Sequence, residues 1–108
     1  MTVNPLITCG TCEYCAGGRN NLCANRSMIG MTRPGGFAER MTIPAGSVID
    51  VPQDMGMREV ALTEPAATAL HALDLATRAL SRPLPEAAVL VIGGGAIGLL
   101  MALLLRSY

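Results

Sequence analysis

The sequence predicts an α/β protein in which a short, turn-rich β region precedes a helical region. Short apolar runs separated by Pro and Gly occupy the first half of the chain, a texture typical of small antiparallel sheets. Near the end, a five-residue apolar run leads directly into a glycine turn and a leucine-rich segment, the pattern of one strand–turn–helix unit. The core must be aliphatic, because 51% of the residues are hydrophobic and only 3% are aromatic.

The β region is expected to contain three short strands. Residues 2–8 form the end of the first strand. A turn at residues 33–36, which includes a proline and two glycines, precedes a second strand over 37–43, where apolar side chains return at strand spacing. The third strand covers residues 48–51 and stops at a proline.

From about Met57 the pattern becomes helical, and Pro65 divides the helical stretch. Residues 81–85 contain two prolines and end it. The uncharged, aliphatic run at residues 88–92 is typical of a buried parallel strand. We place the domain boundary after residue 64, so that a β-domain over residues 1–64 is followed over 65–108 by a linking helix and the strand–turn–helix unit.

All four cysteines of the chain lie in one short loop, residues 9–23: Cys9, Cys12, Cys15 and Cys23. Thiolates at this spacing can converge on one ion, and four of them complete the tetrahedron that Zn²⁺ prefers. Such a closed shell has no open position for substrate, so the ion would be structural. Two disulfides are the alternative, with three possible pairings. The N-terminus lacks an export signal, which favours reduced thiols, a metal and a cytoplasmic protein.

A second motif follows the apolar run. Gly93, Gly95 and Gly98 match G-x-G-x-x-G between a strand and a helix, the context of the dinucleotide fingerprint. The first glycine permits a tight turn, the second lets the backbone approach a pyrophosphate, and the third allows close helix packing. The uncharged stretch 87–105 could instead be a short membrane span, but consecutive glycines disfavour a helix there.

The remaining candidates are single residues. Glu64 stands at the start of a helix, where the helix dipole favours a carboxylate, and His71 is expected to cap or pack rather than to bind a metal. Acidic and basic side chains number eight each and are scattered, so the sequence predicts no nucleic-acid partner.

Taken in order, these motifs resemble the zinc-dependent medium-chain alcohol dehydrogenases. The resemblance rests on Asn4-Pro5-Leu6, the cysteine loop, Gly35-Gly-Phe-Ala-Glu39, Glu64-Pro65 and the glycine motif. The Glu-Pro pair is similar to the sorbitol and threonine dehydrogenase type. The resemblance implies a GroES-like β-domain with a structural-zinc loop, present in part, followed by the first βα unit of a Rossmann fold.

The resemblance also implies a chemistry and roles for residues. The family transfers hydride between a small alcohol or polyol and NAD or NADP, uses a catalytic zinc as Lewis acid, and is commonly homo-oligomeric. By position, the four cysteines would bind the structural Zn²⁺, Glu64 would lie at or near the catalytic Zn²⁺, and Thr68 would lie near the nicotinamide.

The chain departs from the family pattern at both ends. The first catalytic-zinc ligands of the family precede the structural cysteines, whereas this sequence has eight residues before Cys9 and ten after Gly98. We therefore expect a fragment truncated on both sides, with no dehydrogenase activity by itself. A non-catalytic structural-zinc-binding module is the alternative.

Overall fold

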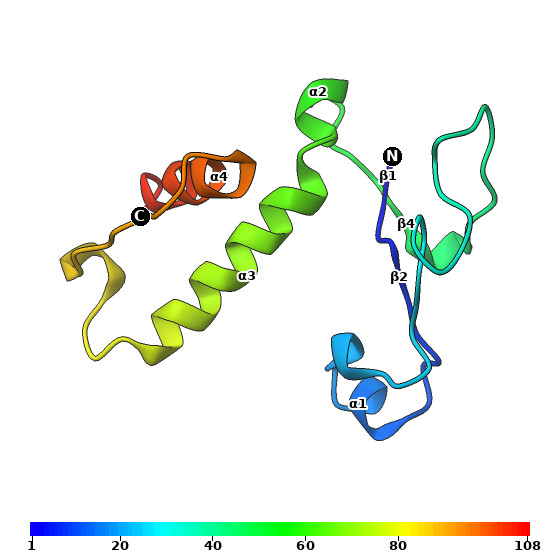
Figure 1. The fold of residues 1–108 in the computed structure, drawn as a ribbon, viewed down its shortest axis with the longest axis horizontal. Helices are drawn as coiled ribbons and strands as arrows, with labels where there is room; N and C mark the ends of the chain where they lie inside the picture. The colour runs from blue at the N-terminus through cyan, green and yellow to red at the C-terminus, as the bar shows by residue number, and fades with distance from the viewer. The chain divides into compact units, whose positions relative to one another are not determined.

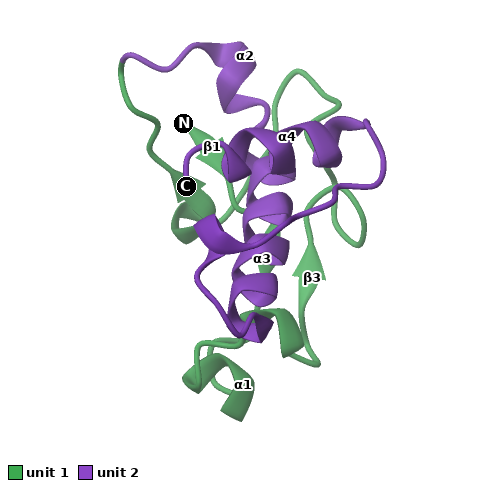
Figure 2. Cartoon of the chain, turned by 90° about the vertical axis from the view of Figure 1, so that its left-hand side faces the viewer, with its two compact units in different colours: residues 1–53 green, residues 54–108 purple.

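The computed structural model describes all 108 residues and divides them into two compact units, residues 1–53 and 54–108 (Figure 2). Figure 1 follows the elements of each unit along the chain. Both strands and helices form, so the α/β class is confirmed. The predicted domain boundary after residue 64 lies in the first turn of the longest helix and stays a prediction.

The first unit contains two small antiparallel sheets. Their strands are β1 (Thr2–Val3), β2 (Leu6–Ile7), β3 (Ser27–Met28) and β4 (Val48–Ile49). Strand β1 pairs with β4, with Thr2 opposite Ile49, and β2 pairs with β3, with Leu6 opposite Met28. The predicted strand at residues 2–8 is therefore two short strands, because Pro5 between them has no N–H to donate.

The predicted strand at residues 37–43 is wrong: this segment forms no ladder and runs as bends and irregular chain. A strand needs a neighbour that exchanges backbone hydrogen bonds with it, and no strand of this unit pairs with residues 37–43. Phe37, expected on the apolar face, is fully exposed. The predicted strand at 48–51 forms over its first two residues, as β4.

The second unit is helical, with α2 (Met57–Val60), α3 (Thr63–Ala79) and α4 (Ala96–Leu105). Pro65 lies in the first turn of α3, where its missing N–H has no helical partner to lose, so it does not divide the helix. The hydroxyl of Thr63 donates to the carbonyl of Val60 at 2.7 Å and secures this start. Ala69 and Leu73 are the buried side chains of α3, which packs against α4.

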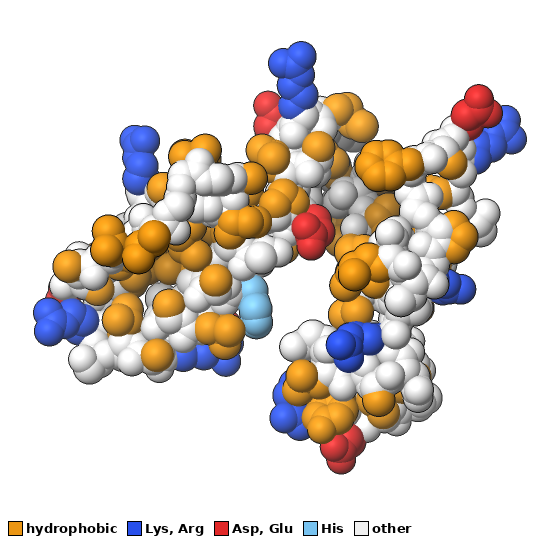
Figure 3. Space-filling view, viewed as in Figure 1, with side chains coloured by type: hydrophobic (Ala, Val, Ile, Leu, Met, Phe, Trp, Pro, Cys, Tyr) orange, Lys and Arg blue, Asp and Glu red, His pale blue; other side chains and the backbone are white.

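The predicted strand at residues 88–92 does not form either, although α4 follows the glycine turn as expected. No other segment of the chain lies beside it in a sheet. Apolar side chains consequently remain on the surface of this unit, as Figure 3 shows. No helix in the chain has the length and apolar character that crossing a membrane requires.

Candidate metal centre

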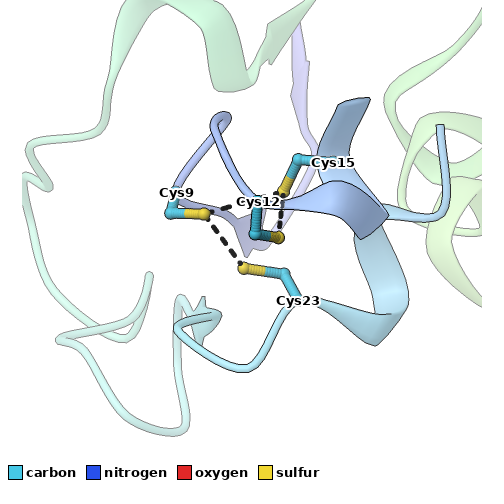
Figure 4. A group of neighbouring side chains, drawn as sticks. All are labelled: Cys9, Cys12, Cys15 and Cys23. Carbon is cyan, nitrogen blue, oxygen red and sulfur yellow. Dashed lines mark hydrogen bonds between the residues drawn. The ribbon is translucent and has the colours of Figure 1, made fainter. Parts of the chain in front are cut away.

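The loop between β2 and β3 brings the four cysteines to one point (Figure 4). Cys12 precedes the single-turn helix α1 (Glu13–Ala16), Cys15 lies within it, and Cys23 follows the 3₁₀ turn η1 (Asn20–Leu22). Gly10 and Gly18 have φ of 75° and 71°, a left-handed backbone that favours glycine. The cysteine spacing alone does not identify these two turns, although a glycine between closely spaced cysteines is a usable signal.

The distances between sulfur atoms fit one tetrahedral metal ion. The Sγ atoms of Cys12 and Cys15 are 3.5 Å apart, those of Cys9 and Cys23 are 3.6 Å apart, and those of Cys9 and Cys15 are 3.9 Å apart. All four lie within 4.8 Å of one another. Four sulfurs placed 2.3 Å from a central zinc would be separated by about 3.8 Å. The cluster therefore fits a structural zinc, and all four thiols are free rather than joined as disulfides.

The backbone of the loop prepares Cys9 to be a thiolate. Hydrogen bonds from the backbone N–H groups of Thr11 and Cys12 lower the pKa of Cys9 from 9.0 to about 6. A hydrogen bond from the backbone N–H of Cys15 also lowers the pKa of Cys12. Burial and the neighbouring thiols outweigh this bond, however, and raise the pKa of Cys12 to about 11. A metal ion would therefore meet one ready thiolate and would have to displace protons from other thiols.

Side chains around the loop support the last ligand. Cys23 is completely buried, and the guanidinium of Arg26 donates to its carbonyl oxygen at 3.2 Å. Within the loop, the guanidinium of Arg19 lies 5.2 Å from the centre of the Tyr14 ring, a cation–π contact. The sequence reasoning missed both arginines, because their role depends on the folded path of the loop.

The glycine motif forms a tight turn before α4. Gly93 has a φ of 107°, a conformation that side chains rarely adopt. A β-carbon on Gly98 would collide with the carbonyl oxygen of Gly93, so the first and third glycines are required by the turn itself. A β-carbon on Gly95, at the N-cap of α4, would meet no atom within 4 Å. Open space thus remains where the fingerprint places a pyrophosphate.

Glu64, Thr68 and His71 share one exposed face of α3, because they are four and three residues apart. The hydroxyl of Thr68 donates to the carbonyl oxygen of Glu64 at 3.4 Å. Neither Glu64 nor His71 joins two further metal-binding side chains within its own unit. The cysteine cluster is therefore the one preformed metal centre within either unit.

Comparison with known proteins agrees with this centre. Residues 1–53 match the family described as the alcohol dehydrogenase GroES-like domain. The L-threonine 3-dehydrogenase of Yersinia enterocolitica is 41% identical over 96 residues, which are 89% of this chain and 26% of that enzyme. The chain thus spans about a quarter of the length of the curated relatives that it matches.

Solved structures extend the similarity to both units. The crystal structure of galactitol-1-phosphate dehydrogenase from Escherichia coli matches with a TM-score of 0.86 and 35% identity, over 97% of this chain and 29% of that one. A short chain alcohol dehydrogenase from E. coli CFT073, complexed with NADH, matches with a TM-score of 0.86 and 29% identity, over 96% of this chain and 29% of that one. From its motifs, its metal centre and these relatives, the chain belongs to the family of zinc-dependent medium-chain alcohol dehydrogenases.

Proposed function

We propose that Cys9, Cys12, Cys15 and Cys23 bind one structural Zn²⁺, and that the chain serves an oxidoreductase that transfers hydride between a small alcohol or polyol and a nicotinamide cofactor. The cluster of four sulfur atoms carries the proposal, because three of its sulfur–sulfur distances, 3.5, 3.6 and 3.9 Å, are close to the separation of about 3.8 Å around a tetrahedral zinc. The names of the relatives, threonine and galactitol-1-phosphate dehydrogenases, support a hydroxylated substrate.

The zinc would be structural rather than catalytic. Four thiolates fill its coordination sphere, so no position is left for a water molecule or an alcohol. Three ligands lie within seven residues and the fourth follows eight residues later, so the ion ties the loop to itself. It also supports the pairing of β2 with β3, since β2 ends just before the loop and β3 begins just after it.

The cofactor would lie at the glycine turn. We assign its pyrophosphate to the open side of Gly95 and to the backbone N–H groups at the start of α4, with Gly93 and Gly98 shaping the turn. Family position assigns Glu64 to the surroundings of a catalytic zinc and Thr68 to those of the nicotinamide. Both side chains are exposed and free to contact a ligand.

The 108-residue chain alone would not oxidise alcohols. The catalytic chemistry of the family needs a zinc with an open position, and within neither unit do three metal-binding side chains other than the cysteines converge. A non-catalytic zinc module is the second candidate. It is favoured by the location of all four ligands within 15 residues of the first unit.

Metal analysis together with cofactor binding tests the proposal. The purified chain should contain one zinc per molecule by elemental mass spectrometry, whereas Cys23→Ser should contain none and Asn21→Ala, an exposed change in the same loop, should retain it. Isothermal titration with NADH separates the two candidates, since the dehydrogenase assignment expects binding that Gly95→Val abolishes. Absence of zinc refutes the metal assignment. Zinc without NADH binding refutes the cofactor assignment for this chain and favours the non-catalytic zinc module.

A further inference from the structure

The four sulfur atoms of the metal centre contact one another in pairs (Figure 4). The Sγ atoms of Cys12 and Cys15 are 3.5 Å apart, and those of Cys9 and Cys23 are 3.6 Å apart. Cys9 and Cys15 make one further contact, at 3.9 Å. Four cysteines allow three complete disulfide pairings. In only one of the three, Cys12 with Cys15 and Cys9 with Cys23, are both pairs in direct contact.

The path of the chain separates these two pairs. Cys12 and Cys15 lie at the start of the single-turn helix α1. Cys9 follows shortly after β2, and Cys23 lies shortly before β3, so a bond between them would close the loop where it joins its sheet. A disulfide places its sulfur atoms about 2.05 Å apart. Each pair therefore has to close by roughly 1.5 Å, a shift that rotation of the side chains can supply once no ion lies between the sulfurs.

We propose that the loop is an oxidation site as well as a zinc site, at which a hydroperoxide converts the zinc-bound cluster into the disulfides Cys12–Cys15 and Cys9–Cys23 and releases the ion. The proposal rests on the zinc assignment made above. Cys9 is exposed, whereas Cys23 is buried behind it in the cluster, so a peroxide reaches Cys9 first and Cys23 completes the bond. All four sulfurs belong to one loop of 15 residues, so the reaction depends on no other part of the chain.

Each disulfide forms in two balanced steps. The thiolate of Cys9 attacks an oxygen of hydrogen peroxide, so that an S–O bond forms, the O–O bond breaks and hydroxide leaves. The thiolate of Cys23 then attacks the sulfur of this sulfenic acid, so that the S–S bond forms, the S–O bond breaks and a second hydroxide leaves. The two thiolates lose two electrons and the peroxide gains them. Because zinc binds thiolates, it leaves as Zn²⁺ when Cys12 and Cys15 react in the same way.

Titration of the zinc-loaded chain with hydrogen peroxide tests the reaction. Its zinc content is measured first, because a chain without zinc refutes the metal assignment itself. Release of the ion should require about two molecules of peroxide, as followed with a chromogenic chelator. Dithiothreitol and added zinc should then restore binding, which separates disulfides from methionine sulfoxide, since only an enzyme reverses the latter. Zinc that stays bound, or a loss that dithiothreitol does not reverse, overturns the oxidation proposal and leaves the zinc assignment standing.

Removal of zinc without oxidation is the matched control. A chelator under anaerobic conditions should leave four thiols that a maleimide labels, whereas the peroxide-treated chain should accept no label. Ala24→Ser, an exposed change beside the last ligand, should behave like the unchanged chain in both treatments. Four labelled thiols after treatment with peroxide would overturn the proposal.

Mass spectrometry of the oxidised chain tests the pairing. Digestion at the acidic residue and the two arginines of this region gives peptides 1–13, 14–19 and 20–26. The proposed bonds link all three, with Cys12 joined to peptide 14–19 and Cys9 joined to peptide 20–26. Fragmentation of the backbone between Cys9 and Cys12 should therefore separate the two linked pairs. An unlinked peptide 1–13, the crossed pairing, or an equal mixture of the three pairings refutes the assignment.

Discussion

Loss of the metal is expected to unfold the first unit and to leave the second one folded. Removal with a chelator and the substitution Cys23→Ser are the two perturbations, since a serine oxygen replaces a soft thiolate that zinc prefers. Cys23 is the one completely buried side chain among residues 1–53, where only Ser47 is also buried. Almost no hydrophobic core would remain to hold this unit.

The magnitude follows from comparing the metal with that core. Structural zinc contributes about 10–16 kcal/mol of apparent binding free energy in zinc-finger peptides, whereas whole domains are stable by about 5–15 kcal/mol. Two sheets of two-residue strands cannot replace such a contribution, because isolated two-stranded pairs are marginal in water. We therefore expect Cys23→Ser to lower the apparent zinc affinity by more than about a hundredfold and to unfold residues 1–53 at ordinary metal concentrations.

Amide hydrogen exchange resolves the two units separately. In the metal-free chain, amides of β2 and β3 should lose protection, while those in the middle of α3 should keep it. Ala24→Ser changes the exposed residue next to Cys23 and should leave both units as they are, so it controls for substitution in the loop. Protected β2 and β3 amides in the metal-free chain would refute the reasoning.

Three further predictions concern other parts of the chain. Gly98→Ala should destabilise the second unit by about 1–3 kcal/mol, because the new β-carbon would collide with the carbonyl oxygen of Gly93. Gly94→Ala is the control and should be near neutral, because a β-carbon there meets no atom within 4 Å. Equal midpoints of urea unfolding for the two variants would contradict this. Thr63→Ala removes the 2.7 Å hydrogen bond at the start of α3 and should cost about 1 kcal/mol in thermal unfolding; an unchanged midpoint would show that the bond contributes nothing. The pKa of Cys9 is lowered to about 6, so this thiol is largely protonated at pH 5.5 and ionised at pH 8, whereas Cys12, with its pKa raised to about 11, is protonated at both. Zinc binding should therefore release more protons at pH 5.5 than at pH 8. Release of an equal number at the two pH values, measured in a weakly buffered titration, would contradict the pKa order.

The features that the sequence predicted correctly are encoded over short distances. The four thiolates lie within 15 residues, so a few turns bring them together without help from the rest of the chain. The turn before α4 is equally local, since Gly93 and Gly98 meet across five residues. Helix α3 follows from its own composition and from the start at Thr63. For these features, residue types and spacing contain nearly all the necessary information.

The incorrect predictions concern strands, which depend on distant partners. Residues 37–43 and 88–92 have the composition of strands, but composition reports only a tendency that packing and pairing must satisfy. In this chain the four short strands pair with one another, and neither segment finds a neighbour. Pro65 is a separate case: proline within a helical pattern predicts a division there, whereas the first turn of α3 tolerates proline.

The same distinction separates the cysteine loop from the segment at residues 88–92. The cysteine loop is complete in itself and needs only an ion, which the sulfur positions already suit. The segment at residues 88–92 is complete in composition but lacks the hydrogen-bonding neighbour that a strand requires. A metal ion can satisfy the first from solution, whereas the second can be satisfied only by another polypeptide strand. At a fixed concentration of free zinc, the fraction of cysteine loops that hold the ion should therefore be independent of protein concentration, and a dilution series monitored for bound zinc checks this.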